Sequence, residues 1–346
     1  MQNFPTVSII IPVFNGANFL RNAINSALNQ TYSNIEIIVI NDGSTDNGQT
    51  EQIARSYGTQ IQYYDKKNGG CGSALNLGIS KMTGSYFSWL SHDDDYFPDK
   101  IKHQIALLAK HKNWDAIAYS GCEFIDENSH YLYTLRPHHL ASFGQLQQPL
   151  YSLFHGYIHG CSLLIPAKLF KQYGTFNETL LSTQDYDCWF RLFRQQELIY
   201  DPKVLIRSRV HPMQSTHTNL GVNTEGNQLW SRLLSEVSPQ EIIKMEGSSA
   251  QFYKKMAKRL ALANYQAASE YAFQRYNACK VLEAPNLPAA QNLENPFIVP
   301  MRYRIAYYLT LLHPQTLIFL FKSFVQKTNS TGLKGALRRM HALFFR

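Results

Sequence analysis

The 346-residue sequence lacks acidic residues at its C-terminal end. No aspartate or glutamate follows Glu294, whereas eight of the 33 lysines and arginines do. The other basic residues therefore balance the 25 acidic ones, and the net charge of +8 belongs to the stretch after Glu294. Such asymmetry predicts an anionic partner, either lipid headgroups or nucleic acid. Because the rest of the chain is formally neutral and contains no recognised nucleic-acid-binding module, we expect no nucleic-acid partner.

Cysteine is scarce and shows no metal-ligand spacing. The five cysteines are scattered between positions 71 and 279, and their odd number favours reduced thiols over a disulfide framework. The first residues lack a basic stretch followed by an apolar run, so we expect no secretory signal. Both observations predict a cytoplasmic protein.

The N-terminal part contains continuous β-branched runs rather than alternating ones. Runs at 7–13 and 35–40 predict strands that are buried on both faces of a parallel sheet. Asn18 is placed to cap a helix with apolar positions from Leu20 to Leu28. Strands alternating with helices predict a doubly wound α/β domain. The further elements expected here are strands at 61–64, 86–90 and 116–119, and helices at 49–57, from about 73, and at 99–112.

This alternation ends after Tyr119. From about Pro239 the pattern is helical, which predicts one domain over residues 1–235 and a basic helical extension over 236–346. Between them we expect a strand hairpin at 123–125 and 131–135, a polar loop at 136–148, strands at 163–165 and 204–209, and helices at 167–173 and 185–194.

Three consecutive carboxylates, Asp93, Asp94 and Asp95, follow the apolar run that ends at Leu90. Like charges side by side repel, so the cluster needs water or a cation to screen it. At the carboxyl end of a buried strand, where open sheets bind ligands, Mg²⁺ or Mn²⁺ with diphosphate oxygens is the natural partner. A solvated acidic turn is the alternative for this motif taken alone.

Three polar loops are expected at the same edge of the sheet. In the loops 12–16 and 41–46, Phe14 offers a stacking face and Asp42 can accept a hydrogen bond from a base N–H. The glycines of the loop 68–73 let the backbone approach an anion before a helix begins. This loop matches neither the dinucleotide pattern nor the Walker sequence, and turn chemistry explains each loop equally well by itself.

Six stretches in one order resemble the family 2 glycosyltransferases of GT-A fold. The resemblance implies a nucleotide-sugar-binding fold, with a Rossmann-like, mixed and mainly parallel sheet between helices, and a C-terminal helical extension. It also implies a nucleotide-sugar donor, in the first instance a UDP-sugar, a divalent cation (Mn²⁺ or Mg²⁺) and inversion at the anomeric carbon. The matching stretches are 7–16, 24–32, 36–46, 68–79, 89–100 and 184–192.

The resemblance also implies roles for individual residues. Asp93 corresponds to the last aspartate of the D-x-D motif and would bind the metal, with His211 completing the metal site. Asp185 corresponds to the general base that takes the proton of the acceptor hydroxyl. The residues implied in donor binding are Pro12, Phe14, Asn15, Asp42, Asn68, Gly69, Gly70, Ser73, Asn76, Ser91, His92 and Asp94.

Two positions depart from the family pattern. Ser91 stands where the first aspartate of D-x-D is common, and Leu75 where an arginine is common, so Lys66 or Lys67 would have to supply that contact. These departures leave a catalytically impaired nucleotide-sugar-binding or scaffold protein as the alternative, whereas the retained carboxylates favour an enzyme. For other polar residues we expect mainly structural roles: Asp94 supports Asp93 or its loop, Asp95 is solvated, and Asp187 is structural. His159 is expected to pack, with contact to the acceptor sugar as the alternative.

The basic C-terminal region suggests contact with a membrane surface. The nearly uncharged stretch 305–321 is short for a membrane span and contains Pro314, while apolar residues at helical spacing between Leu333 and Phe344 alternate with basic ones. This pattern predicts a helix lying on the anionic inner face of the membrane; a helix packed on the catalytic domain is the alternative. With the resemblance, it implies a glycan or lipid-linked acceptor and surface-polysaccharide biosynthesis, such as lipopolysaccharide or capsule.

Overall fold

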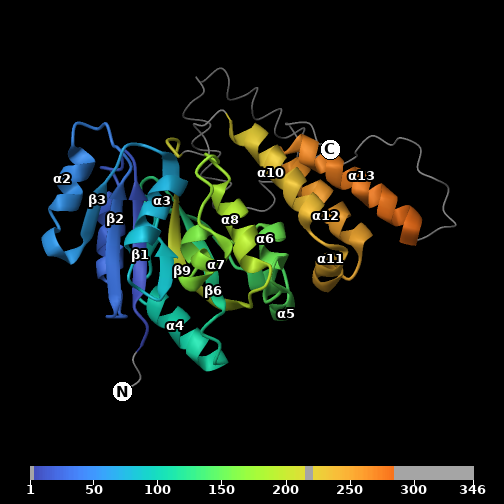
Figure 1. Ribbon diagram of the computed structural model, residues 1–346, viewed down its shortest axis with the longest axis horizontal. Helices are drawn as coiled ribbons and strands as arrows, with labels where there is room; N and C mark the ends of the chain where they lie inside the picture. Colours follow the sequence, from blue (N-terminus) through green and yellow to red (C-terminus); the bar gives the residue numbers. More distant parts are fainter. Residues whose placement is uncertain (1–3, 215–220, 284–346) are drawn as a thin grey trace, which may run out of the picture.

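The computed structural model describes residues 4–214 and 221–283. The chain crosses the molecule from a first sheet at one end to a group of helices at the other (Figure 1). The described α-helices are α1 Leu20–Leu28, α2 Gln49–Arg55, α3 Gly70–Lys81, α4 Lys100–His111, α5 Phe143–Leu146, α6 Tyr151–His155, α7 Lys168–Tyr173, α8 Gln184–Phe193, α10 Val222–Glu236, α11 Pro239–Glu246, α12 Ser249–Leu262 and α13 Gln266–Glu283. Three short 3₁₀ turns are η1 Gly58–Gln60, η2 Pro137–His139 and η3 Gly160–Ser162.

The first sheet has the strand order β3-β2-β1-β4-β8. Its first four strands are parallel, and the short β8 is antiparallel to β4. The carboxyl ends of β1, β2 and β4 therefore lie at one edge, as the sequence predicted. The strands are β1 Val7–Val13, β2 Ile35–Asn41, β3 Gln62–Asp65, β4 Tyr86–Trp89 and β8 Ile165–Pro166.

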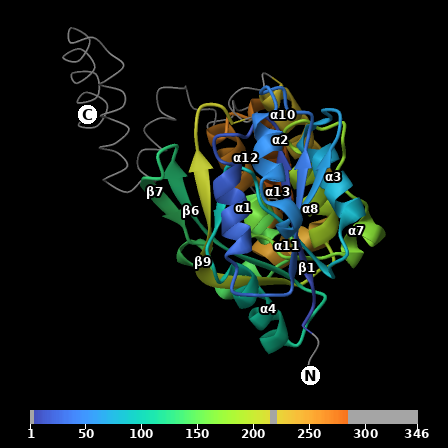
Figure 2. The same ribbon diagram turned by 90° about the vertical axis from the view of Figure 1, so that its left-hand side faces the viewer.

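Alternate residues of β1 belong to two different hydrophobic cores. Ile10 lies in the core on the α3 side of the sheet, and Ile9 and Ile11 lie in the core on the α1 side (Figure 2 shows α1 and α2 on this face). All three side chains are fully buried, which explains the unbroken apolar run. Helix α3 approaches closely because Gly78 has no side chain; a β-carbon there would lie 2.4 Å from Cγ2 of Ile10.

The second sheet has the strand order β5-β9-β6-β7. The sequence predicted two strands around 116–125, but a single strand bends through Gly121, where the register shifts. Strand β9 is longer than predicted, and it pairs in parallel with β6 and antiparallel with β5, with Asp95 opposite Arg207. The strands are β5 Asp95–Tyr96, β6 Ile117–Asp126, β7 Tyr131–Leu135 and β9 Leu198–Val210. The fold is thus the mixed α/β arrangement that the sequence predicted.

Two local predictions were wrong. Helix α1 begins at Leu20 with Phe19, not Asn18, as its N-cap residue, because the backbone turns at Gly16, whose carbonyl accepts from Phe19 and Leu20. The polar stretch 136–148 contains η2 and α5 rather than only a loop; Ser142 and Gln145 form a capping box at α5.

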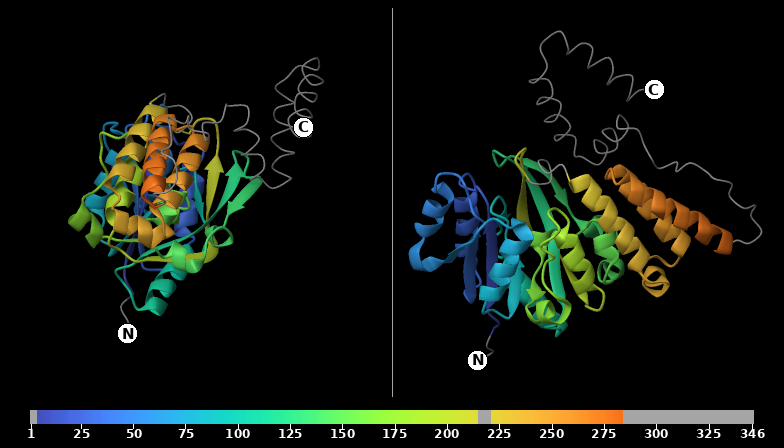
Figure 3. Two further views of the ribbon diagram at one scale, coloured as in Figure 1. Left: turned by 90° about the vertical axis from the view of Figure 1, so that its right-hand side faces the viewer. Right: turned by 45° about the horizontal axis from the view of Figure 1, so that its top comes forward.

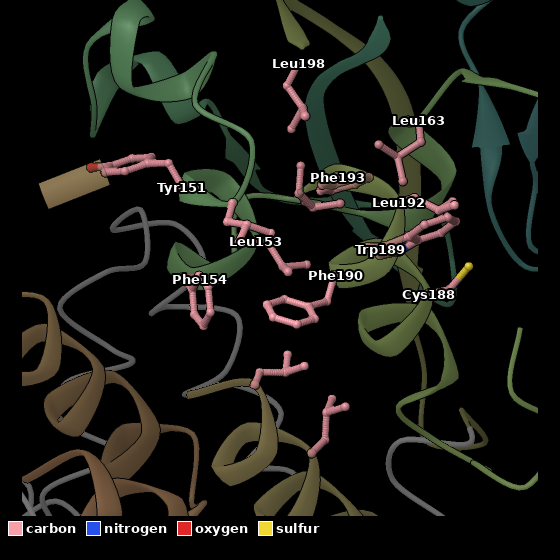
Figure 4. Close-up of a cluster of buried hydrophobic side chains, with 14 of the residues drawn as sticks. Tyr151, Leu153, Phe154, Leu163, Cys188, Trp189, Phe190, Leu192, Phe193 and Leu198 are labelled. Carbon is pink, nitrogen blue, oxygen red and sulfur yellow. The ribbon is translucent and has the colours of Figure 1, made fainter. Parts of the chain in front are cut away.

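The helices α10 to α13 share a core with the sheet-containing part of the molecule (Figure 3). The ring of Phe154 in α6 lies 6.2 Å from Phe190 of α8, 6.1 Å from Trp230 of α10 and 5.2 Å from Phe252 of α12. Figure 4 shows Phe154 and Phe190 within this cluster. The predicted boundary after residue 235 thus falls at the end of α10, within a continuous core. Among the described helices none is long and apolar enough to cross a membrane, and the predictions for 305–344 fall outside the described residues.

Candidate active site

The loops after β1 and β2 are joined by hydrogen bonds. The backbone N–H of Asn15 donates to Oγ of Ser44 (2.9 Å), and its side-chain oxygen accepts from the N–H of Thr45 (2.7 Å). Phe14 is 45% exposed beside them, whereas Pro12 is buried within β1. The structure thus places an accessible aromatic face at this edge of the sheet, where the sequence predicted base stacking.

The carboxylate of Asp42 links β2 to the first turn of α3. It accepts hydrogen bonds from Nζ of Lys66 (2.8 Å) and from the backbone N–H groups of Gly69 (3.0 Å) and Gly70 (2.8 Å). Gly43 makes this approach possible: its φ is +71°, and a β-carbon there would lie 2.6 Å from the nitrogen of Asn68. A carboxylate has about four acceptor positions, so these three hydrogen bonds leave one open; contact of Asp42, which is 3% exposed, with a base stays a prediction.

Other predicted donor-binding residues of this region differ in position. Ser73 is buried, with its hydroxyl close to Gly69. The amide of Asn76 donates to the carbonyl of Phe176 (2.9 Å) and to Glu178 (2.8 Å), so it connects α3 to the segment before α8. Its contact with a donor stays a prediction. Leu75 is fully buried in the core, away from any ligand.

Asp93 and His211 lie together at the end of β4. Oδ2 of Asp93 is 3.0 Å from Nε2 of His211, and this hydrogen bond and the charge of His92 lower the pKa of Asp93 although burial acts to raise it. His92 packs on Gly16, and burial lowers its pKa. Ligands at about 2.1 Å from an octahedral ion are about 3 Å from one another, so this pair fits a divalent cation, and its imidazole favours Mn²⁺ over Mg²⁺.

Ser91 and Asp94 point inward, toward Cys161. The thiol accepts from the backbone N–H of Ser91 (3.3 Å) and donates to Oδ2 of Asp94 (3.3 Å). Asp94 is 3% exposed, and its other oxygen accepts from the backbone N–H of Arg209 (2.9 Å). Asp94 supports its loop, as the sequence predicted, while donor contacts of Ser91 and Asp94 stay predictions. His159 packs beside them, with Nε2 3.1 Å from Oγ of Ser208.

Arg209 was missed by the sequence analysis. Its guanidinium is 1% exposed and donates to the carbonyl of Asp93 (3.1 Å), to Oδ2 of Asp95 (3.3 Å) and to the β6–β7 turn through Oγ of Ser129 (2.9 Å). The ring of Phe19 lies below it at 4.5 Å. The prediction that Asp95 is solvated was therefore wrong, because the Arg209 guanidinium pairs with it. The position of Arg209, two residues before His211, was the only signal in the sequence.

Asp185 lies in the first turn of α8. Its Oδ1 accepts from the backbone N–H of Tyr186 (2.8 Å), and burial, assisted by the charge of Glu225, raises the pKa of Asp185 to about 6. A carboxyl group with such a pKa can accept a proton near neutral pH. Asp187 instead forms ion pairs with Arg191 (3.1 Å) and Arg232, the structural role that the sequence predicted.

The first turn of α3 joins the Asp42 loop to the start of α8. The backbone N–H of Gly70 donates to Asp42, and a β-carbon at Gly72 would lie 3.4 Å from Cγ of Gln184, the residue before Asp185. Cys71 lies between these two glycines; burial, with smaller contributions from the charges of Asp185, Asp42 and Asp93, raises the pKa of its thiol to about 12. Sequence analysis did not select Cys71, because a lone cysteine in a glycine-rich loop carries no motif.

Comparisons with known proteins identify related glycosyltransferases. The model of Glycosyl transferase family 2 matches residues 8–174. A protein named uncharacterized glycosyltransferase from Rickettsia typhi is 54% identical over 253 residues, which cover 73% of this chain and 79% of that protein. A second from Rickettsia bellii is 51% identical over 279 residues, 81% of this chain but 40% of that protein. The chain thus spans about 40% of the length of several such relatives.

A solved structure supports the fold. The crystal structure of Staphylococcus aureus TarS 1–349 in complex with UDP-GlcNAc superposes with a TM-score of 0.55 over 84% of this chain and 95% of that one. The sequences are 14% identical over this alignment, so the likeness concerns the fold.

Proposed function

Because the chain belongs to the family 2 glycosyltransferases, we propose that it transfers a sugar from a nucleotide-sugar donor to a hydroxyl of a glycan or lipid-linked acceptor, with inversion at the anomeric carbon. The observation that supports this proposal is the position of the first turn of α3, where Gly70 binds Asp42 and Gly72 approaches Gln184, the residue before Asp185. A UDP-sugar is the donor we propose, since the TarS structure of the same fold contains UDP-GlcNAc.

On the acceptor side, Asp185 is the proposed general base. It takes the proton of the acceptor hydroxyl while the oxygen attacks the anomeric carbon, and the bond from that carbon to the diphosphate breaks with its electron pair leaving on the diphosphate. Attack opposite the leaving group inverts the anomeric configuration. The pKa of about 6 leaves Asp185 mostly ionised at neutral pH yet basic enough to accept the proton.

On the donor side, Asp42 accepts the base N–H and Phe14 stacks on the base. Asp93 and His211 are the residues that would hold a divalent cation, which supplies positive charge to the departing diphosphate when it is bound. Lys66, which reaches Asp42, adds a positive charge at the nucleoside end of the site, where the family arginine is replaced by Leu75.

The second candidate is a catalytically impaired protein that binds nucleotide sugars. Ser91 supports it, because the side chain at this position faces Cys161 rather than a ligand. The pairing of Asp93 with His211 and the raised pKa of Asp185 favour the enzyme. Turnover distinguishes the two candidate functions. An enzyme releases UDP from UDP-sugars, whereas the impaired protein binds UDP-sugars without releasing UDP.

The test is the release of UDP from a panel of UDP-sugars with Mn²⁺, by the wild type and by Asp93→Ala. We expect the variant to lose metal-dependent UDP release and the thermal shift that UDP with Mn²⁺ produces. Asp115→Ala is the matched control, because Asp115 is an exposed carboxylate whose partner is Lys168, a residue outside the site. If UDP binding and turnover are unchanged in Asp93→Ala, the proposed metal site is wrong.

We further propose that the protein works in the cytoplasm, associated peripherally with the inner face of the membrane through its basic C-terminal region, in cell-surface polysaccharide biosynthesis. The support is the charge distribution, with every excess positive charge after Glu294. Flotation with anionic and with neutral lipid vesicles tests this proposal: binding that is equal for both vesicle types, or absent for both, would contradict it.

A further inference from the structure

We infer that Glu225 of α10 is a positioning residue for the general base, an inference that rests on the proposed role of Asp185. Its carboxylate accepts from three consecutive backbone N–H groups, of Leu181 (2.8 Å), Ser182 (2.8 Å) and Thr183 (2.7 Å). It also accepts from the hydroxyls of Ser182 and Thr183, both at 2.8 Å. One side chain thus fixes the whole segment that leads into α8.

This segment needs an external partner. The first N–H groups of a helix and of the turn before it have no intrahelical acceptor, and a side chain at the N-cap commonly satisfies one of them. Here the N-cap residue of α8 is Thr183, and its hydroxyl donates to Glu225 rather than accepting from the helix. Hydrogen bonds to a carboxylate are about twice as strong as neutral ones, so Glu225, from another helix, holds the turn that precedes α8.

The geometry connects this turn to both sides of the site. Asp185 follows Thr183 by two residues, so a shift of the segment moves the base. Leu181 lies at the other end of the segment. Its Cδ2 atom is 3.9 Å from the place that a β-carbon of Gly70 would take, and Gly70 is one of the two glycines that bind Asp42. Arg232, two turns further along α10, pairs with Asp187 and fixes α8 a second time.

Glu225 also acts on the base through its charge. The titratable groups that interact electrostatically with Asp185 are Cys71 of α3, Glu225 of α10, and Tyr186 and Cys188 of α8 itself. Burial acts to raise the pKa of Glu225, but its hydrogen bonds lower it, so Glu225 stays ionised where Asp185 titrates. The negative charge of Glu225 then adds to the main effect of burial, and both raise the pKa of Asp185.

The test compares Glu225→Gln with Glu236→Gln in the full chain, using UDP-GlcNAc with Mn²⁺ as the probe. Glutamine keeps one acceptor oxygen but has an NH₂ group in place of the other, and this NH₂ group cannot accept from the N–H donors it would face, so we expect kcat to fall about 10- to 100-fold with the donor KM within twofold. We also expect the acid limb of the kcat profile to move to lower pH. Glu236 lies on the same helix and is exposed, and Arg232 pairs with Asp187 through its other guanidinium nitrogen, so the Glu236 variant should behave as wild type.

Glu225→Asp keeps the charge but withdraws the carboxylate by one methylene, so it should lower kcat without moving the pH profile. If Glu225→Gln does not fold, Glu225→Asp serves as the test variant in its place. If the folded Glu225 variants keep the wild-type kcat and pH profile while Asp185→Asn is inactive, the role of Glu225 is overturned. If Asp185→Asn is itself active, the proposed base is wrong instead.

Discussion

The two sides of the site are built in different ways. On the donor side, Asp42, Lys66 and Gly70 come from neighbouring strand ends and loops, and they bind one another directly. On the base side, Asp185 starts a helix whose preceding segment is fixed by Glu225, a residue of the C-terminal helices. The difference teaches that the donor side follows from the sheet topology, whereas the base side depends on how α10 packs.

Replacing Asp185, the proposed base, should give the largest effect on kcat and leave the donor side unchanged. Asp185→Asn keeps the size of the side chain but cannot take a proton at neutral pH, so we expect kcat to fall about 10²- to 10⁴-fold. The dissociation constant of UDP, measured by calorimetry with Mn²⁺, should stay unchanged. A parallel loss of UDP binding would show that the two sides are not independent.

Removing the buried Arg209 guanidinium should destabilise the loop that carries Asp93, on the donor side of the site. Arg209→Met leaves Asp95 and several carbonyls without their partner, and breaking such a buried pair costs about 3–5 kcal/mol of unfolding free energy. Urea unfolding measures this loss. Arg207→Met is the control, because its pair with Glu123 is more exposed and should contribute about 1 kcal/mol or less. Equal effects of the two variants would refute the role assigned to Arg209.

A smaller effect is expected at the nucleoside end. Asp42→Asn loses the charge that binds Lys66 and one acceptor for the α3 N–H groups, so we expect about tenfold weaker UDP binding. The kcat at saturating donor should change little. Asp65→Asn, at the exposed end of β3, serves as the control. A fall in kcat with unchanged UDP binding would contradict the assignment of Asp42 to the donor side.

The smallest effect is a pH dependence confined to the base side. Because the pKa of Asp185 is raised to about 6, the base is protonated below that value, and kcat should fall about tenfold per pH unit there. The same raised pKa means that the folded state binds the proton more tightly, so stability declines as pH rises from about 4 to 6. A flat kcat profile between pH 5 and 7 would contradict the assignment.

The sequence predicted what depends on local pattern. The apolar run of β1 indicated a strand buried on both faces, and the carboxylates after β4 indicated a cation site, since strand ends meet at one edge. The His211 partner of Asp93 came from the resemblance, and the structure places the two 3.0 Å apart. These features need only the alternation of strands and helices and a known motif order.

What the sequence did not predict depends on contacts between distant parts of the chain. Arg209 and Asp95 are more than a hundred residues apart, and Glu225 meets Thr183 from another helix. Arginine and glutamate are common on protein surfaces, so the sequence did not indicate that Arg209 is buried or that Glu225 binds another segment. The inward direction of Ser91 follows from Cys161, which only the fold brings beside it.

The two-residue strand β5 has a consequence for insertions and deletions. Its pairing of Asp95 with Arg207 and of Tyr96 with Ile206 adds to the longer pairing with β6, and together they fix which face each residue of β9 presents. A slip of one residue would turn every β9 side chain to the opposite face, carrying Arg209 away from Asp95 and displacing His211 from Asp93. An insertion or deletion of a single residue in β9 would therefore separate His211 from Asp93 without changing either of these two residues.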